Sequence, residues 1–211
     1  MSFKITLYSQ AASSACERVR IALAYKSIAY DTIIINKLPP GEYARVNPQG
    51  LMPTMAIDDR VISQSMAMLE FLEEICPEPS LLPGDPITRA EVRAFAQIIA
   101  SDIHPVGINR LRKKMRNDFG ASEDQTMVWY DDMAQGGFAV LEGILEQTRG
   151  EGPYCFGQEL TLADVVMVPH MHTARSRGVD FSAFPLVMSV FEHCIVHPDF
   201  VKAARDNQAD A

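Results

Sequence analysis

The stretch from Asn47 to Ser65 carries backbone and side-chain groups that suit an extended peptide ligand. Pro53 cannot donate to a β-ladder, so a proline at the mouth of a predicted strand marks an edge or a turn. If the Met52-Pro53 bond is cis, the backbone of Met52 faces outward with both polar groups free for strand addition. Gln64 and Ser65 stand where a helix begins, which suits a carboxylate. We therefore expect a site for an extended peptide with a carboxylate at one end.

A second chemical feature is the pair Ser13-Ser14, which lies between a predicted strand and a predicted helix. A helix N-terminus favours negative charge, and a serine there could donate a hydrogen bond to the thiolate of a bound cofactor and lower its pKa. The alternative is that these serines only cap the helix. Cys16 also admits two interpretations, a reactive thiol at a helix start or a small buried residue, and we favour the buried residue.

Hydrophobic periodicity predicts the elements that position these residues. Before residue 77 the strand and helix patterns alternate, which is typical of a small α/β sandwich of thioredoxin type. The expected strands are 3–8, 30–35, 54–57 and 61–63, and the expected helical segments are 16–25, a turn near 43, and 65–75.

Prolines at positions 77, 79, 83 and 86 interrupt this pattern and predict a linker. After the linker only helical patterns remain, at 89–101, 127–148, 161–168, 185–193 and 198–206. Residues 207–211 have no apolar anchor, and we expect them to fray. The predicted organisation is an α/β domain over 1–77, a linker over 78–88 and an all-helical domain over 89–211.

Composition narrows the classes of function. The chain is 47% hydrophobic and 22% charged, as in ordinary globular proteins, and its net charge of −8 disfavours nucleic-acid binding. No apolar run suggests a membrane span, and the four dispersed cysteines predict reduced thiols in the cytoplasm. The histidine pairs lack a third ligand at a recognisable spacing, so no metal site is predicted. We interpret the basic run Arg110–Arg116 mainly as a solvated helix face.

Several motifs in order resemble those of zeta-class glutathione transferases, over residues 3–206. They are Ser13-Ser14 with Arg18-Val19-Arg20-Ile21-Ala22-Leu23, Asn47-Pro48 with Met52-Pro53-Thr54, Gln64-Ser65 with Glu70-Phe71-Leu72-Glu73-Glu74, Leu81-Leu82-Pro83, and Thr161-Leu162-Ala163-Asp164. The resemblance implies a thioredoxin-like N-terminal domain followed by an all-α C-terminal domain. It also implies a homodimeric, glutathione-dependent cis–trans isomerase of maleylacetoacetate or maleylpyruvate, which serves the catabolism of aromatic compounds.

The resemblance assigns a role to each matching residue of the first domain. Ser13, with Ser14 beside it, would face the sulfur of glutathione. Met52, before a cis Pro53, would pair with the cysteinyl backbone. Gln64 and Ser65 would hold the γ-glutamyl carboxylate of glutathione. Gln49 would contact its glycine end.

In the second domain the resemblance assigns His104 and Asn109 to the cofactor side of the site and Arg110 to catalysis and the substrate. A further family arginine falls near Arg175 and Arg177, which we also expect to bind substrate carboxylates.

The chain departs from the family pattern at Ala12, where the family has an arginine, and at Ala15 and Glu17. Two alternatives therefore stay open, a transferase that conjugates or reduces other electrophiles and a binding protein without turnover.

Overall fold

Four short strands form a mixed sheet in the first part of the chain. The central strand β1 (Ile5–Ser9) pairs in parallel with β2 (Asp31–Ile34) and antiparallel with β3 (Thr54–Ile57), which pairs antiparallel with β4 (Arg60–Ser63). The strand order is β2-β1-β3-β4. Buried and half-buried residues alternate along β1, because successive side chains point to opposite faces of a sheet. The strands predicted from the sequence are confirmed to within a few residues.

The structure describes residues 3–211, which form two units; residues 1 and 2 of our predicted first domain lie outside this part. The first unit runs to Leu81 and also includes Val196–Ala211, and the second unit is Leu82–Ile195. We expected every residue after 89 to belong to the helical domain. The C-terminal segment joins the first unit because α9 (Pro198–Ala203) packs against α1 (Ser14–Tyr25).

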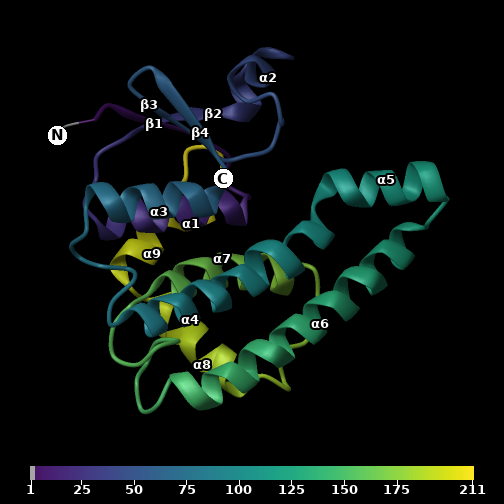
Figure 1. Cartoon of the computed structure of the whole chain (residues 1–211). Coiled ribbons are helices and arrows are strands. Elements are labelled where there is room, and N and C mark those ends of the chain that lie inside the picture. The colour runs from purple at the N-terminus through teal and green to yellow at the C-terminus, as the bar shows by residue number, and fades with distance from the viewer. Residues whose placement is uncertain (1–2) are drawn as a thin grey trace. The chain divides into compact units, whose positions relative to one another are not determined.

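The helices of the first unit cover its sheet. Figure 1 shows α1 and α3 (Ser65–Ile75) side by side below the strands, with α2 (Glu42–Val46) near the other side of the sheet. The remaining helical elements of this unit are short 3₁₀ turns, η1 (Ile35–Lys37) and η4 (Arg205–Asn207). Apolar residues with no exposed surface form the core, among them Leu7, Val19, Leu23, Met55, Met68 and Leu72. This core packs α1 and α3 against the sheet, and the residues with predicted chemistry lie at the starts of these two helices.

Residues 207–211, which we expected to fray, have polar anchors in the structure. The Gln208 amide donates to the carbonyls of Lys202 and Ala204 at 3.1 and 3.0 Å, and the Asn207 amide donates to the carbonyl of Val201 at 2.6 Å. The anchors are polar side chains, so a search for apolar anchors could not find them.

The second unit is helical throughout its regular elements. The element α4 (Pro86–Gln97) continues into the π-helical segment η2 (Ile98–Ile103) and the 3₁₀ turn η3 (Pro105–Gly107). Four helices complete the unit: α5 (Asn109–Phe119), α6 (Glu123–Thr148), α7 (Leu162–Ser176) and α8 (Pro185–Cys194). The sequence pattern indicated α6, α7 and α8, and α5 carries the basic run.

Two helix starts in this unit follow capping rules. Helix α4 begins inside the linker predicted for 78–88, because Asp85 accepts hydrogen bonds from Ile87 and Thr88 and Pro86 occupies the first helical position. The predicted cap of α7 is confirmed. The carboxylate of Asp164 accepts hydrogen bonds from the backbone N–H and the hydroxyl of Thr161, each at 2.8 Å.

Across the described residues, 3–211, no helix combines the length and apolar character needed to cross a membrane.

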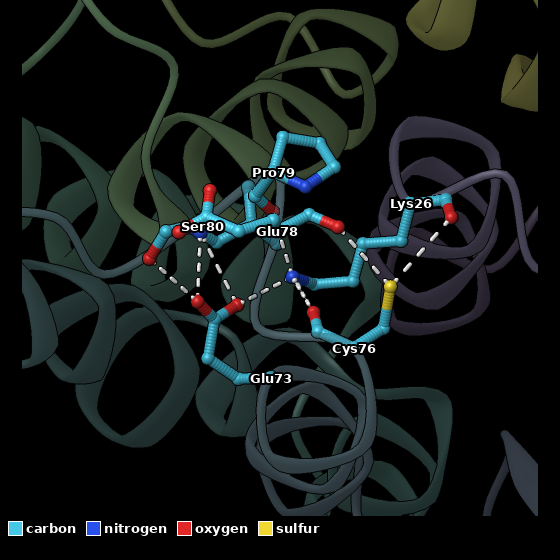
Figure 2. Close-up of polar contacts among 7 residues, drawn as sticks. Lys26, Glu73, Cys76, Glu78, Pro79 and Ser80 are labelled. Atoms are coloured by element: carbon cyan, nitrogen blue, oxygen red, sulfur yellow. Dashed lines mark hydrogen bonds and ion pairs between the residues drawn. The ribbon is translucent and has the colours of Figure 1, made fainter. Parts of the chain in front are cut away.

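A buried ion pair joins the ends of α1 and α3 to the chain that follows (Figure 2). The Lys26 ammonium lies 2.8 Å from a Glu73 carboxylate oxygen and donates to the carbonyls of Cys76 at 2.7 Å and Pro79 at 2.8 Å. The Glu73 carboxylate also accepts from the Ser80 hydroxyl at 2.7 Å. The Lys26 side chain has no exposed surface and that of Glu73 is 9% exposed. This network holds residues 76–80 against the ends of α1 and α3.

We predict that Lys26→Met lowers the free energy of unfolding by about 3–5 kcal/mol, because it leaves the buried Glu73 carboxylate without its cation. Urea denaturation measures the loss. The double variant Lys26→Met with Glu73→Gln should recover part of it. Lys37→Met, at an exposed lysine of η1, is the matched control. A Lys26→Met protein as stable as this control would contradict a stabilising role for the buried Lys26–Glu73 ion pair.

Candidate functional site

Ser13 and Ser14 lie at the start of α1 but in different environments. Ser13 is the N-cap, and its hydroxyl oxygen accepts a hydrogen bond from the Cys16 N–H at 3.3 Å. Its side chain is half-buried, whereas Ser14 is only 5% exposed. Ser13 therefore caps the helix. Capping uses the oxygen as an acceptor and leaves the hydroxyl proton free to donate elsewhere. Ser13 is thus the more accessible of the two serines.

Cys16 has no exposed surface, which confirms that it is a buried residue. Burial raises the pKa of its thiol, and this effect outweighs the hydrogen bond to Ser13, which lowers it. The thiol therefore stays protonated near neutral pH. A protonated, buried thiol is a poor nucleophile, so the redox interpretation of Cys16 loses its basis.

Buried polar groups hold the loop between α2 and β3. The Asn47 amide nitrogen donates to the Leu51 carbonyl at 2.7 Å and to the Thr54 hydroxyl at 3.0 Å, while its oxygen accepts from the Gln49 N–H at 3.0 Å. The Tyr43 hydroxyl donates to the Leu51 carbonyl at 2.7 Å and lies 2.7 Å from the Thr54 hydroxyl. Desolvation raises the pKa of Tyr43, so it remains a donor. The chain's own buried side chains therefore set the shape of the loop.

Our sequence analysis missed Tyr43 and Thr54 as part of this site. Thr54 has no exposed surface although it opens a strand, and Tyr43 is 9% exposed on a helix of only five residues. The available signal was a polar residue directly after Pro53 in an otherwise apolar segment.

The predicted peptide-binding residues meet beside this loop. The Met52-Pro53 bond is cis, as expected. Met52 lies outside the β-ladder, and no backbone hydrogen bond to it occurs within residues 3–211. The Gln64 amide donates to the Gln49 side-chain oxygen at 2.9 Å, which joins two of the predicted contacts.

Gln64 has an unusual backbone conformation at the start of α3. Its φ is +73°, a region that residues other than glycine rarely adopt. Such strain persists where the surrounding structure demands it and often marks a functional position. Ser65, 8% exposed, is the first residue of α3, and Gln64 makes no side-chain cap. The first-turn N–H groups of α3, without that cap, suit an anion.

In the second unit, the predicted site residues His104, Asn109 and Arg110 differ in burial. His104 is half-buried beside His170, with ring centroids 5.9 Å apart. Asn109 and Arg110 are exposed in the first turn of α5. Three more basic residues of the run form local ion pairs, Arg112 and Arg116 with Glu123 and Lys114 with Asp118. Lys113 and Lys114 are exposed, as on a solvated helix face, whereas the Arg112 side chain is only 15% exposed.

Arg175 and Arg177 also differ. The Arg177 guanidinium stands 4.5 Å above the Tyr130 ring and is half-buried, and desolvation lowers its pKa. Gly107 permits this packing, because a Cβ there would come within 2.4 Å of Tyr130 and 2.6 Å of Arg177. Arg175 is exposed, with its guanidinium 5.2 Å from the Phe191 ring. Of the two, Arg177 is therefore the one held in a fixed, partly desolvated place, which suits a carboxylate.

Metal binding finds no support in the part of the chain that the structure describes. There, no group of three or more histidine, cysteine, aspartate and glutamate residues could hold an ion. The groups that can do chemistry are instead hydroxyls, amides and helix N-termini in the first unit and guanidinium groups in the second.

Comparison with known proteins identifies the family of this chain. The model of the glutathione S-transferase N-terminal domain matches residues 12–75. The maleylacetoacetate isomerase of Dictyostelium discoideum is 36% identical, over 99% of this chain and 96% of its own. The holo structure of a maleylpyruvate isomerase, described as a bacterial zeta-class glutathione S-transferase, is 36% identical with a TM-score of 0.91, over 98% and 99% of the two chains. A maleylacetoacetate isomerase of Anaeromyxobacter dehalogenans, solved with glutathione in its active site, is 33% identical with a TM-score of 0.88, over 100% and 99%. The chain belongs to the zeta-class glutathione transferases, the family of the maleylacetoacetate and maleylpyruvate isomerases.

Proposed function

We propose that this protein is a glutathione-dependent cis–trans isomerase of maleylacetoacetate or maleylpyruvate. The observation that carries the proposal is the half-buried hydroxyl of Ser13 at the start of α1, in a family whose members bind glutathione. An accessible hydroxyl at a helix N-terminus suits the thiolate that such an isomerase must maintain.

Glutathione binds along the wall of the first unit formed by residues 49–53 and the start of α3. The free backbone groups of Met52 pair with the cysteinyl residue of glutathione by strand addition. The γ-glutamyl carboxylate lies at Gln64 and Ser65, where the uncapped first turn of α3 supplies N–H donors and a favourable dipole. Gln49, already bonded to Gln64, contacts the glycine end. The buried Asn47 network keeps this wall rigid.

The reaction requires a nucleophile that can later leave. The glutathione thiolate adds to one carbon of the cis double bond, so that a carbon–sulfur bond forms and the π electrons move to the conjugated carbonyl oxygen as an enolate. The former double bond is now single and rotates. Collapse of the enolate expels the thiolate and restores the double bond in the trans form. Ser13 holds the thiolate by donating its hydroxyl proton in a hydrogen bond, and glutathione is not consumed.

The substrate is a diacid, so cations must hold its carboxylates. Among the three predicted arginines, Arg177 suits this role best, because stacking on Tyr130 fixes its guanidinium in a partly buried place. Arg110 and Arg175 are exposed and supply longer-range positive potential. His104 and Asn109 remain our candidates for contacts on the cofactor side.

The wider setting follows from the family. The substrates named for the relatives support a role in the catabolism of aromatic compounds, and the family resemblance supports a homodimer. All four cysteines are free thiols, which supports a cytoplasmic location.

We predict that the purified protein isomerises maleylpyruvate or maleylacetoacetate only when glutathione is added, and that it acts on these diacids faster than on an aryl halide or a hydroperoxide. Loss of absorbance from the cis diketo acid measures the first reaction. Faster turnover of the other electrophiles would favour the conjugating or reducing transferase instead. Glutathione binding without turnover of any substrate would favour the non-catalytic protein.

We predict that Ser13→Ala raises the pKa of the bound glutathione thiol by about one unit and lowers kcat/KM for the isomerisation about tenfold, because the thiolate loses a hydrogen-bond donor. Ultraviolet absorbance of the thiolate against pH reports the first effect. Ser122→Ala is the matched control, since Ser122 also caps a helix and accepts from Gln125 at 3.1 Å. Both variants lose a cap worth about 1 kcal/mol. An unchanged thiol pKa in Ser13→Ala would refute the role of Ser13.

A further inference from the structure

The loop between β1 and α1 is held by a buried arginine rather than by its own side chains. The Arg20 guanidinium, 1% exposed, donates to the Ser9 hydroxyl at 3.0 Å, to the Gln10 carbonyl at 3.3 Å and to the Ala11 carbonyl at 3.3 Å. Its fourth hydrogen bond goes to the carbonyl of Ala203, in α9, at 2.9 Å. One side chain thus connects the loop that leads to Ser13 with the C-terminal segment of the chain.

That segment also contacts the loop directly. The Asp210 carboxylate accepts a hydrogen bond from the Ala11 N–H at 3.0 Å. Both backbone polar groups of Ala11 are therefore bound, one by Asp210 and the other by Arg20. Ala11 is 2% exposed, so water cannot readily replace either partner.

A short chain of contacts leads from these groups to Ser13. The Ser13 N–H donates to the Gln10 carbonyl at 3.2 Å, the same oxygen that accepts from Arg20. Residues 11 and 12 are alanines, which have no polar side chain to hold the turn themselves. The position of the Ser13 backbone therefore depends on groups outside the loop.

The residues that carry Asp210 are themselves anchored. Phe200 and Ala203 of α9 are buried, and α9 packs against α1. The Gln208 amide bonds to two carbonyls of the preceding segment. The segment that carries Asp210 is thus held by its own contacts. The hydrogen bond of Asp210 can therefore constrain the loop between β1 and α1.

We propose that Arg20 and Asp210 are positioning residues for Ser13, and that the C-terminal segment 198–211 thereby belongs to the machinery that activates the thiol of glutathione. This inference rests on the proposed function. A hydroxyl stabilises a thiolate only at hydrogen-bond distance, and a misplacement of about 1 Å can cost about a hundredfold in rate. The C-terminal segment maintains that distance through the backbone of residues 10–13.

The test compares Asp210→Ala with Asp210→Asn. The alanine removes the acceptor for the Ala11 N–H, whereas the asparagine keeps an oxygen in its place. We expect Asp210→Ala to raise the pKa of the bound glutathione thiol and to lower kcat/KM about tenfold, and Asp210→Asn to restore most of both. Asp206→Ala is the control, because it removes the same charge from an exposed residue of the same segment. If Asp210→Ala matches this control in both properties, the inference is overturned.

Hydrogen exchange of the unmutated protein gives a second test that needs no variant. The Ala11 amide should be protected, and exchange at the rate of a free amide would overturn the inference even if Asp210→Ala fails to fold. Failure of the proposed function looks different, because the unmutated protein would then isomerise neither diacid in the presence of glutathione. Isomerisation by the unmutated protein with no effect of Asp210→Ala rejects only the role of the C-terminal segment.

Discussion

A thiolate persists near neutral pH only where the protein supplies hydrogen-bond donors and positive potential at the sulfur. In the proposed mechanism this chain must meet that constraint without a cation in the loop of residues 10–13, where residues 11 and 12 are alanines. The groups that remain are the Ser13 hydroxyl and the N-terminus of α1. Both act only over short distances, so the position of the β1–α1 loop becomes the main requirement on the fold. The buried Arg20 guanidinium and the Asp210 carboxylate meet that requirement from outside the loop.

The proposed glutathione-binding wall, residues 49–53 and the start of α3, is also held in place by buried polar groups. Asn47, Tyr43 and Thr54 are buried polar residues that bond to one another and to the Leu51 carbonyl. A buried network with all its partners satisfied is rigid, because breaking any bond leaves an unpaired polar group. It leaves the backbone of Met52 available for a ligand. The wall is therefore preorganised, which lowers the entropy that glutathione must lose on binding.

Much of this could be predicted from the sequence, because the decisive signals are local. Alternating and helical periodicity located the four strands and the long helices, the Ser-Ser and Gln-Ser pairs marked the starts of α1 and α3, and Pro53 marked the cis bond. Long-range contacts were missed. The hydrogen bond from the Ala11 N–H to Asp210 joins residues 199 positions apart, and no local sequence pattern near either residue predicts this contact. The role of Tyr43 was also missed, because its hydrogen-bond partners Leu51 and Thr54 lie outside its own short helix. The choice between Arg175 and Arg177 depended on which one stacks on Tyr130.

The central claim is that the start of α1, through Ser13, keeps the sulfur of bound glutathione ionised. A pH titration of glutathione bound to the unmutated protein, followed by the ultraviolet absorbance of the thiolate, tests this most directly. The account predicts a thiol pKa clearly below that of free glutathione. A bound thiol that titrates at the same pH as the free tripeptide would contradict it.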